Sequence, residues 1–220
     1  MEKTSGWQLV VSVLVAFLLW FVMFSPWTGP KLNFWWAMTA SACVLTAMAL
    51  PFLMAHREKV AWGCETAKRL RSEVEQEIVL GVLIAIALWC VFWVGDKLSG
   101  MMFDFARPQV DGIYEMKEGS QPWLIALLLL CIIGPAEELF WRGYVQRFLS
   151  MRWGGNAALG VTTLVYTMIH LPSMNFMLIM AALTCGICWG GLYRLFPKHL
   201  PAIVISHALW DAAAFVWIPI

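Results

Sequence analysis

Residues 78–95 read IVLGVLIAIALWCVFWVG, a run without any charged side chain. An apolar run of this length is typical of a membrane span, because a helix needs about 20 such residues to cross the hydrocarbon core of a bilayer. Inside the bilayer, only a helix satisfies its backbone polar groups within one segment. This stretch therefore predicts a transmembrane helix.

The rest of the chain has the same character. Of its 220 residues, 61% are hydrophobic and 13% are charged, whereas about 25% are charged in a typical soluble domain. We therefore expect an all-α polytopic membrane protein of about seven transmembrane helices, which contacts the lipid bilayer. The expected spans are roughly 7–25, 34–54, 78–95, 122–149, 156–171, 176–194 and 200–218.

The two ends of the chain are expected on opposite sides of the membrane. Residues 20–26 are bulky and lack a small-residue cleavage site, so we expect a retained first helix, not a removed signal peptide. Cytoplasmic segments carry an excess of Lys and Arg. With the N-terminus inside, the inner segments hold ten such cations and the outer segments four, leaving out Arg142. The count predicts a cytoplasmic N-terminus and an external C-terminus.

Two polar segments interrupt the apolar pattern. Residues 55–77 have a charge spacing that suits a surface helix leading into the third span, and residues 96–121 are expected to form the longest loop. We divide the single membrane domain into N-terminal helices with these two polar segments, 1–121, and a second part, 122–220. The net charge of +1 gives no electrostatic case for binding nucleic acid.

Ionisable side chains are costly inside a span and usually mark function, and here they gather in the second half. Residues 134–142 read GPAEELFWR. Glu138 and Arg142, four residues apart, can pair on one helix face, whereas Glu137 is rotated by about 100° from Glu138. One carboxylate can therefore be neutralised while the other acts as a general base. The alternative is a structural ion pair, which two acids and one arginine fit poorly.

Two further helices carry polar pairs at the same four-residue spacing, Tyr166 with His170 and His207 with Asp211. Each pair could simply satisfy itself within its helix. Together with Glu137, however, they could activate a water and stabilise an oxyanion. Two His and one carboxylate could instead bind zinc, although no HExxH motif is present.

Other residues of this region have simpler interpretations. Cys185 and Cys188 form a CxxC inside a span without a second pair, so a redox or metal role is not expected. Gly186 and Gly190 are four apart, which favours close helix packing.

The three motifs resemble those of the type II CAAX prenyl endopeptidases, also called the CPBP family of CAAX and bacteriocin-processing proteases. The family pattern is EExxxR, then FxxxH, then HxxxN or HxxxD. This sequence has EELFWR at 137–142, YTMIH at 166–170 and HALWD at 207–211. The resemblance covers roughly residues 122–215. Tyr166 replaces the usual Phe, and Asp211 stands where many members have Asn.

The resemblance implies a glutamate-dependent intramembrane protease with its active-site cavity among the last four spans. Glu137 and His170 would activate the attacking water, while His207 and Asp211 would bind the oxyanion. Glu138, Arg142 and Tyr166 would support the site. No cofactor is expected, with zinc held by Glu137, His170 and His207 as the alternative. An ionised Asp211 would oppose an oxyanion unless protonated or paired with His207.

The sequence thus predicts an endopeptidase that cleaves a membrane-bound or membrane-associated protein, by CaaX-type or C-terminal sorting-signal processing. The alternatives are a proton-coupled transporter and a non-enzymatic immunity or scaffold protein. A proton relay would need polar groups reaching both membrane surfaces, and the first three spans contain almost no ionisable residue. At about 1.5 Å per residue, His170 is expected about 10 Å farther from the inner surface than Glu137.

Overall fold

The computed structural model describes residues 6–56 and 64–220, with side chains for all of these except 64–70. Within those ranges the chain is helical and contains no strand, which confirms the predicted all-α class. Lys3 and the cations of 57–70, which contribute to the orientation count, lie outside the described side chains. The principal helices are α1 (Gly6–Phe24), α2 (Phe34–Ala55), α3 (Cys64–Met102), α4 (Ala106–Glu115), α5 (Pro122–Leu128), α6 (Gly134–Glu138), α7 (Arg147–Trp153), α8 (Gly155–Met168), α9 (Phe176–Leu195) and α10 (Leu200–Ala212).

Six helical stretches of the described chain are long and apolar enough to cross a membrane. They are Gly6–Phe24, Phe34–Ala55, Arg71–Met102, Pro122–Trp153, Phe176–Leu195 and Pro197–Trp217. The remaining expected span, 156–171, corresponds to α8, whose 14 residues extend for only about 21 Å. The chain is therefore a multi-pass membrane protein in which one helix of the bundle is short.

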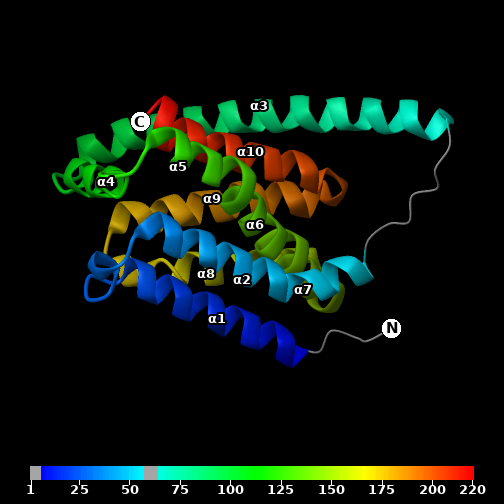
Figure 1. Cartoon of the computed structure of the whole chain (residues 1–220), viewed down its shortest axis with the longest axis horizontal. Helices are drawn as coiled ribbons and strands as arrows, with labels where there is room; N and C mark the ends of the chain where they lie inside the picture. The colour runs from blue at the N-terminus through cyan, green and yellow to red at the C-terminus, as the bar shows by residue number, and fades with distance from the viewer. Residues whose placement is uncertain (1–5, 57–63) are drawn as a thin grey trace.

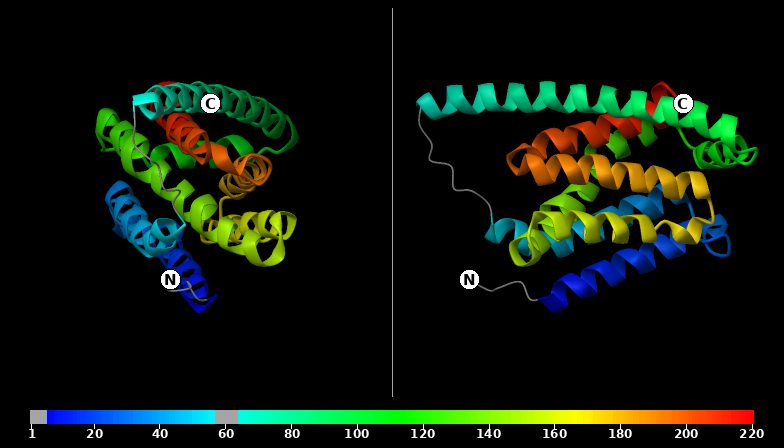
Figure 2. Two further views of the ribbon diagram at one scale, coloured as in Figure 1. Left: turned by 90° about the vertical axis from the view of Figure 1, so that its right-hand side faces the viewer. Right: turned by 180° about the vertical axis from the view of Figure 1, so that it is seen from behind.

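The helices run alternately up and down, so the segment ends gather at two ends of the bundle (Figure 1 and Figure 2). The start of α1, the end of α2, the start of α3 and the α9–α10 connection lie at one end. The links from α1 to α2 and from α8 to α9 lie at the other, where the C-terminus also lies. This is the grouping of ends that the charge count assumed, and the side of the membrane stays a prediction.

The loop expected over 96–121 is largely helical, which corrects the prediction. Helix α3 continues to Met102, and α4 occupies Ala106–Glu115. Arg107 holds this segment together, because it lies 2.7 Å from Asp111, one turn along α4, and 3.4 Å from Asp96 of α3. Four of the charged residues in this segment, Asp96, Lys97, Arg107 and Asp111, form ion pairs on helix surfaces. The segment expected as a surface helix before the third span is likewise continuous with α3 from Cys64.

The fourth span is an irregular helix. It consists of α5, α6 and α7 joined by two wide π-helical stretches, Leu129–Ile133 and Leu139–Gln146. Pro135 has no N–H to donate to the preceding turn, and the first wide stretch ends directly before it, with the Gly134 N–H bonded to the Leu129 carbonyl. Such widened turns are frequent at functional sites. The short helix α6 between them carries both acidic residues of the motif.

Small residues bring the surrounding helices into contact with this span. A Cβ at position 134 would lie 2.8 Å from the Cα of Ala208, so glycine allows α6 to touch α10. A Cβ at position 190 would lie 2.9 Å from Leu159 of α8. The close packing expected for the glycines of α9 is confirmed, and it places α8, α9 and α10 around α6.

Candidate active site

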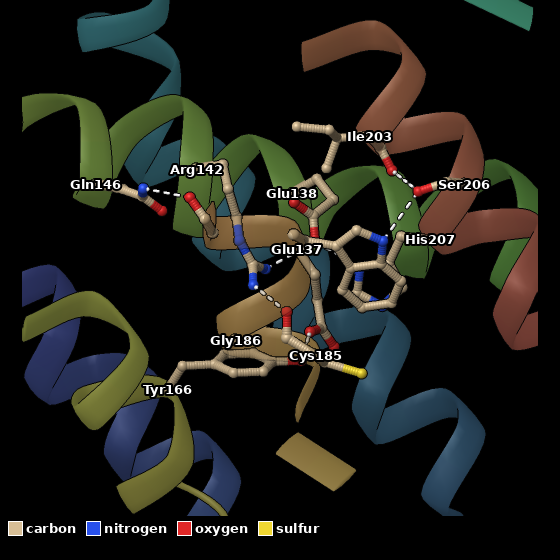
Figure 3. Close-up of polar contacts among 12 residues, drawn as sticks. Glu137, Glu138, Arg142, Gln146, Tyr166, Cys185, Gly186, Ile203, Ser206 and His207 are labelled. Carbon is tan, nitrogen blue, oxygen red and sulfur yellow. Dashed lines mark hydrogen bonds and ion pairs between the residues drawn. The ribbon is translucent and has the colours of Figure 1, made fainter. Parts of the chain in front are cut away.

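A buried ion-pair cluster centres on Glu138. Its Oε1 lies 2.7 Å from Nη1 of Arg142 and 2.6 Å from Nδ1 of His207 (Figure 3). Glu138 is 0% exposed and Arg142 1%. The four-residue spacing predicted the pair with Arg142, but not the bond to His207, which comes from α10. The cluster therefore ties the broken helix to α10 and neutralises one of the two adjacent carboxylates.

Arg142 also links the cluster to α9 and α8. Its Nη2 donates to the carbonyl of Cys185 at 3.2 Å, and its guanidinium lies 5.1 Å from the ring centre of Tyr166. Cys185 thus takes part through its backbone, while its side chain is a buried free thiol. In the same helix, the Gly190 carbonyl accepts from Nε2 of Gln146 at 2.8 Å. These bonds to α9 fix the face of the fourth span on which Arg142 lies.

Glu137 points away from the cluster, as the 100° rotation predicted. Among the described residues its hydrogen-bond partner is Tyr166, whose hydroxyl donates to Oε2 at 3.0 Å. Glu137 is nevertheless 7% exposed. The two adjacent glutamates therefore have different environments, one fully buried and held by Arg142 and His207, the other held by a phenol beside a cavity.

Tyr166 lies between Glu137 and His170. While its hydroxyl binds Glu137, its backbone carbonyl accepts from Nδ1 of His170 at 2.8 Å. The described structure shows no direct hydrogen bond between Glu137 and His170. The difference in height expected from the rise per residue accounts for this, because Tyr166, one turn before His170, is level with the carboxylate.

Nε2 of His170 has a partner that the motifs do not contain. The indole N–H of Trp20, in α1, donates to it at 3.2 Å, and Trp20 is 0% exposed. Phe24, one turn further along α1, packs on the same imidazole with ring centres 5.6 Å apart. No motif in the sequence predicts this bond, which joins residues 150 apart.

His207 is held on several sides. Its Nδ1 faces Glu138, and its Nε2 lies 3.4 Å from Oδ2 of Asp211. The indole of Trp189 stacks on the imidazole, with ring centres 3.8 Å apart and planes inclined by 19°. Trp189 is itself fixed by its N–H bond to Oγ of Ser206 at 2.9 Å. The distance to Asp211 exceeds that of an ordinary hydrogen bond, so Nε2 has the weaker contact of the two nitrogens.

A cavity of about 590 Å³ opens beside these residues. All four residues predicted to be catalytic line it, Glu137, His170, His207 and Asp211, and so does Tyr166. Its remaining lining is mainly apolar and aromatic and includes side chains of α1, α2 and α3. The cavity therefore extends beyond the last four spans to which the sequence analysis confined it.

The alternative zinc set does not fit this arrangement. Zinc requires a free lone pair on each imidazole ligand. Both ring nitrogens of His170 have protein partners, and both nitrogens of His207 face carboxylates. Among the described residues, no three His, Cys, Asp or Glu side chains converge as a metal site.

The comparison with known families agrees with the three motifs. Residues 119–213 match the family model described as type II CAAX prenyl endopeptidase Rce1-like. No curated protein and no solved structure shows a significant match to the chain. The matched segment begins just before α5 and ends just after α10, so it contains every residue of the Glu138 cluster. The segment that carries Glu137, His170, His207 and Asp211 is therefore similar to the Rce1-like type II CAAX prenyl endopeptidase family.

Proposed function

We propose that this protein is an intramembrane endopeptidase that hydrolyses a peptide bond of a membrane-anchored protein with a water activated by Glu137 and His170. The main support for the proposal is that the two adjacent glutamates have different surroundings. Glu138 is held by Arg142 and His207, whereas Glu137 lines the cavity. A carboxylate that has no cationic partner among the described residues and lies beside a cavity suits a general base.

The proposed reaction needs one proton acceptor that later becomes a donor. Glu137 takes a proton from water as the oxygen attacks the scissile carbonyl carbon. The C–N bond then breaks, and the proton passes to the leaving nitrogen. Tyr166 orients the carboxylate through its hydroxyl bond. The products are a new carboxyl group and a new amine, and Glu137 returns to its starting state.

We further propose that His207 stabilises the oxyanion. Glu138 and Trp189 fix its ring, the residue lines the cavity, and its Nε2 makes only a long contact to Asp211. A donor held in place before the reaction stabilises developing charge without the cost of reorganisation. An ionised Asp211 would weaken this effect, so the proposal requires Asp211 to be protonated or to stay paired with His207.

The family match and the cavity lining support a proposal for the substrate class. The family's name describes prenylated CaaX proteins, and the mainly apolar walls suit a lipid-anchored or membrane-spanning tail. We propose prenylated CaaX tails first and membrane-anchored C-terminal sorting signals second. Both present a peptide bond close to a hydrophobic group, which the cavity could accept beside Glu137.

Comparing protein termini in cells tests the proposal. Cells would carry the wild type, Glu137→Gln, or the control Glu118→Gln, which changes a glutamate after α4. Terminus-selective proteomics should find uncut precursors only with Glu137→Gln, at equal protein levels. Identical termini in all three would refute the protease and favour a proton-coupled transporter or an immunity or scaffold protein.

A further inference from the structure

The imidazole of His170 has no free lone pair in this structure. The Tyr166 carbonyl can only accept, so Nδ1 carries the proton, and the Trp20 indole can only donate, so it takes the lone pair of Nε2. An imidazole in this state can neither accept a hydrogen bond from the attacking water nor bind a metal. Yet the proposed reaction uses His170 together with Glu137.

The group that blocks His170 comes from outside the family segment. Trp20 belongs to α1, far from the matched residues 119–213. Helix α1 lies at the edge of the bundle in both views (Figure 1 and Figure 2), and only 28% of its span is buried. A peripheral helix can move with less disruption than one packed on all sides.

The same helix also faces the cavity. Phe24, one turn after Trp20, lines the cavity and contacts the His170 ring. It also packs edge-on against Phe34 of α2, with ring centres 5.4 Å apart. A ligand that fills this part of the cavity contacts Phe24, and a shift of this end of α1 moves Trp20 together with Phe24 because the two residues are four apart on one helix face.

We propose that Trp20 is an inhibitory residue, whose indole N–H caps the lone pair of His170 until a substrate in the cavity displaces α1. The inference rests on the proposed function, since it assumes that His170 acts on the water. The cap would keep the empty site inactive. Substrate binding would then release the imidazole at the moment when the scissile bond arrives.

Removing the indole N–H tests this directly. Trp20→Phe keeps an aromatic ring, and replacing Trp20 by 3-benzothienylalanine, with sulfur in place of N–H, keeps the full shape. Hydrolysis of a quenched-fluorescent farnesylated CaaX peptide would be followed in proteoliposomes. A hydrogen bond of about 0.5–1.5 kcal/mol corresponds to roughly a two- to tenfold change in rate. Both variants should therefore raise kcat/KM by about two- to tenfold.

The control is Trp89→Phe, which removes an indole donor that binds the Ile218 carbonyl at 3.0 Å. It should leave kcat/KM within about twofold of the wild type, within the scatter of such measurements. A fall or no change in kcat/KM for the two Trp20 variants would overturn the proposal, because a merely structural tryptophan lowers activity when removed.

A spectroscopic measurement separates this inference from the protease proposal. The chain has four His, so the ¹⁵N ring signals of His170 can be assigned by comparison with His170→Gln. The Nε2 signal should move in Trp20→Phe, and move in the same direction when the farnesylated peptide is added to Glu137→Gln. An Nε2 signal unchanged by Trp20→Phe refutes the cap. Absence of hydrolysis by the wild type refutes the protease alone.

Discussion

We predict that the stability of the protein depends on the Glu138 carboxylate, and the adjacent Glu137 provides a control. Glu138→Gln removes the charge that pairs with Arg142 and His207, both of which stay buried. Breaking a buried ion pair by neutralising one partner costs about 3–5 kcal/mol. For a chain of this size, each kcal/mol shifts Tm by roughly 2–4 °C. The variant should therefore melt roughly 6–20 °C below the wild type.

Thermal unfolding in detergent, followed by tryptophan fluorescence, measures this shift, and Glu137→Gln is the matched control. The two residues are adjacent and undergo the same chemical change. Glutamine at 137 can still accept the Tyr166 hydroxyl, so the control should lose at most about 1 kcal/mol, the value of one hydrogen bond. Equal melting temperatures for Glu138→Gln and the wild type would refute the idea that Glu138 stabilises the buried side chains of Arg142 and His207.

Three further predictions concern the reaction itself. Tyr166→Phe introduces the residue usual in the family and removes the bond to Glu137, so kcat should fall by about tenfold. A kcat equal to that of the wild type would show that Tyr166 does not orient the carboxylate. Asp211→Asn removes a carboxylate 3.4 Å from Nε2 of His207, so kcat should at least equal that of the wild type. A decrease in kcat of more than tenfold would show that the carboxylate is needed. Dialysis against a zinc chelator should leave the rate of hydrolysis unchanged. A loss of activity that added zinc reverses would support the alternative of a zinc-dependent protease.

Much of the fold could be predicted because the bilayer limits the choices. Apolar runs of this length are longer than the core helices of soluble proteins require, so they predict membrane spans. Six of the seven expected spans are long enough in the structure to cross a membrane. The structure of the polar segments was harder to predict from the sequence. Residues 96–121 looked like a loop because their charges were counted without partners, yet Arg107 pairs with Asp96 and Asp111 and supports a helix.

The contacts within the site also fall into a group that the sequence predicts and a group that it does not. Contacts within one helix follow from the four-residue spacing, so the Glu138–Arg142 pair and the separate direction of Glu137 could be predicted. Contacts between helices depend on packing angles, which periodicity does not contain. For that reason the bond from His207 to Glu138, the stacking of Trp189 and the Trp20 cap on His170 appeared only in the structure.

The central claim is that Glu137 is the base of a peptide hydrolysis reaction. Its most direct test is the rate at which purified wild type and Glu137→Gln, in proteoliposomes, cleave a peptide spanning the bond located by the comparison of termini. Loss of a general base costs about 10²–10⁴-fold, so kcat of the variant should fall by at least about a hundredfold, with KM and Tm close to those of the wild type. Hydrolysis by Glu137→Gln at the wild-type rate would contradict the account.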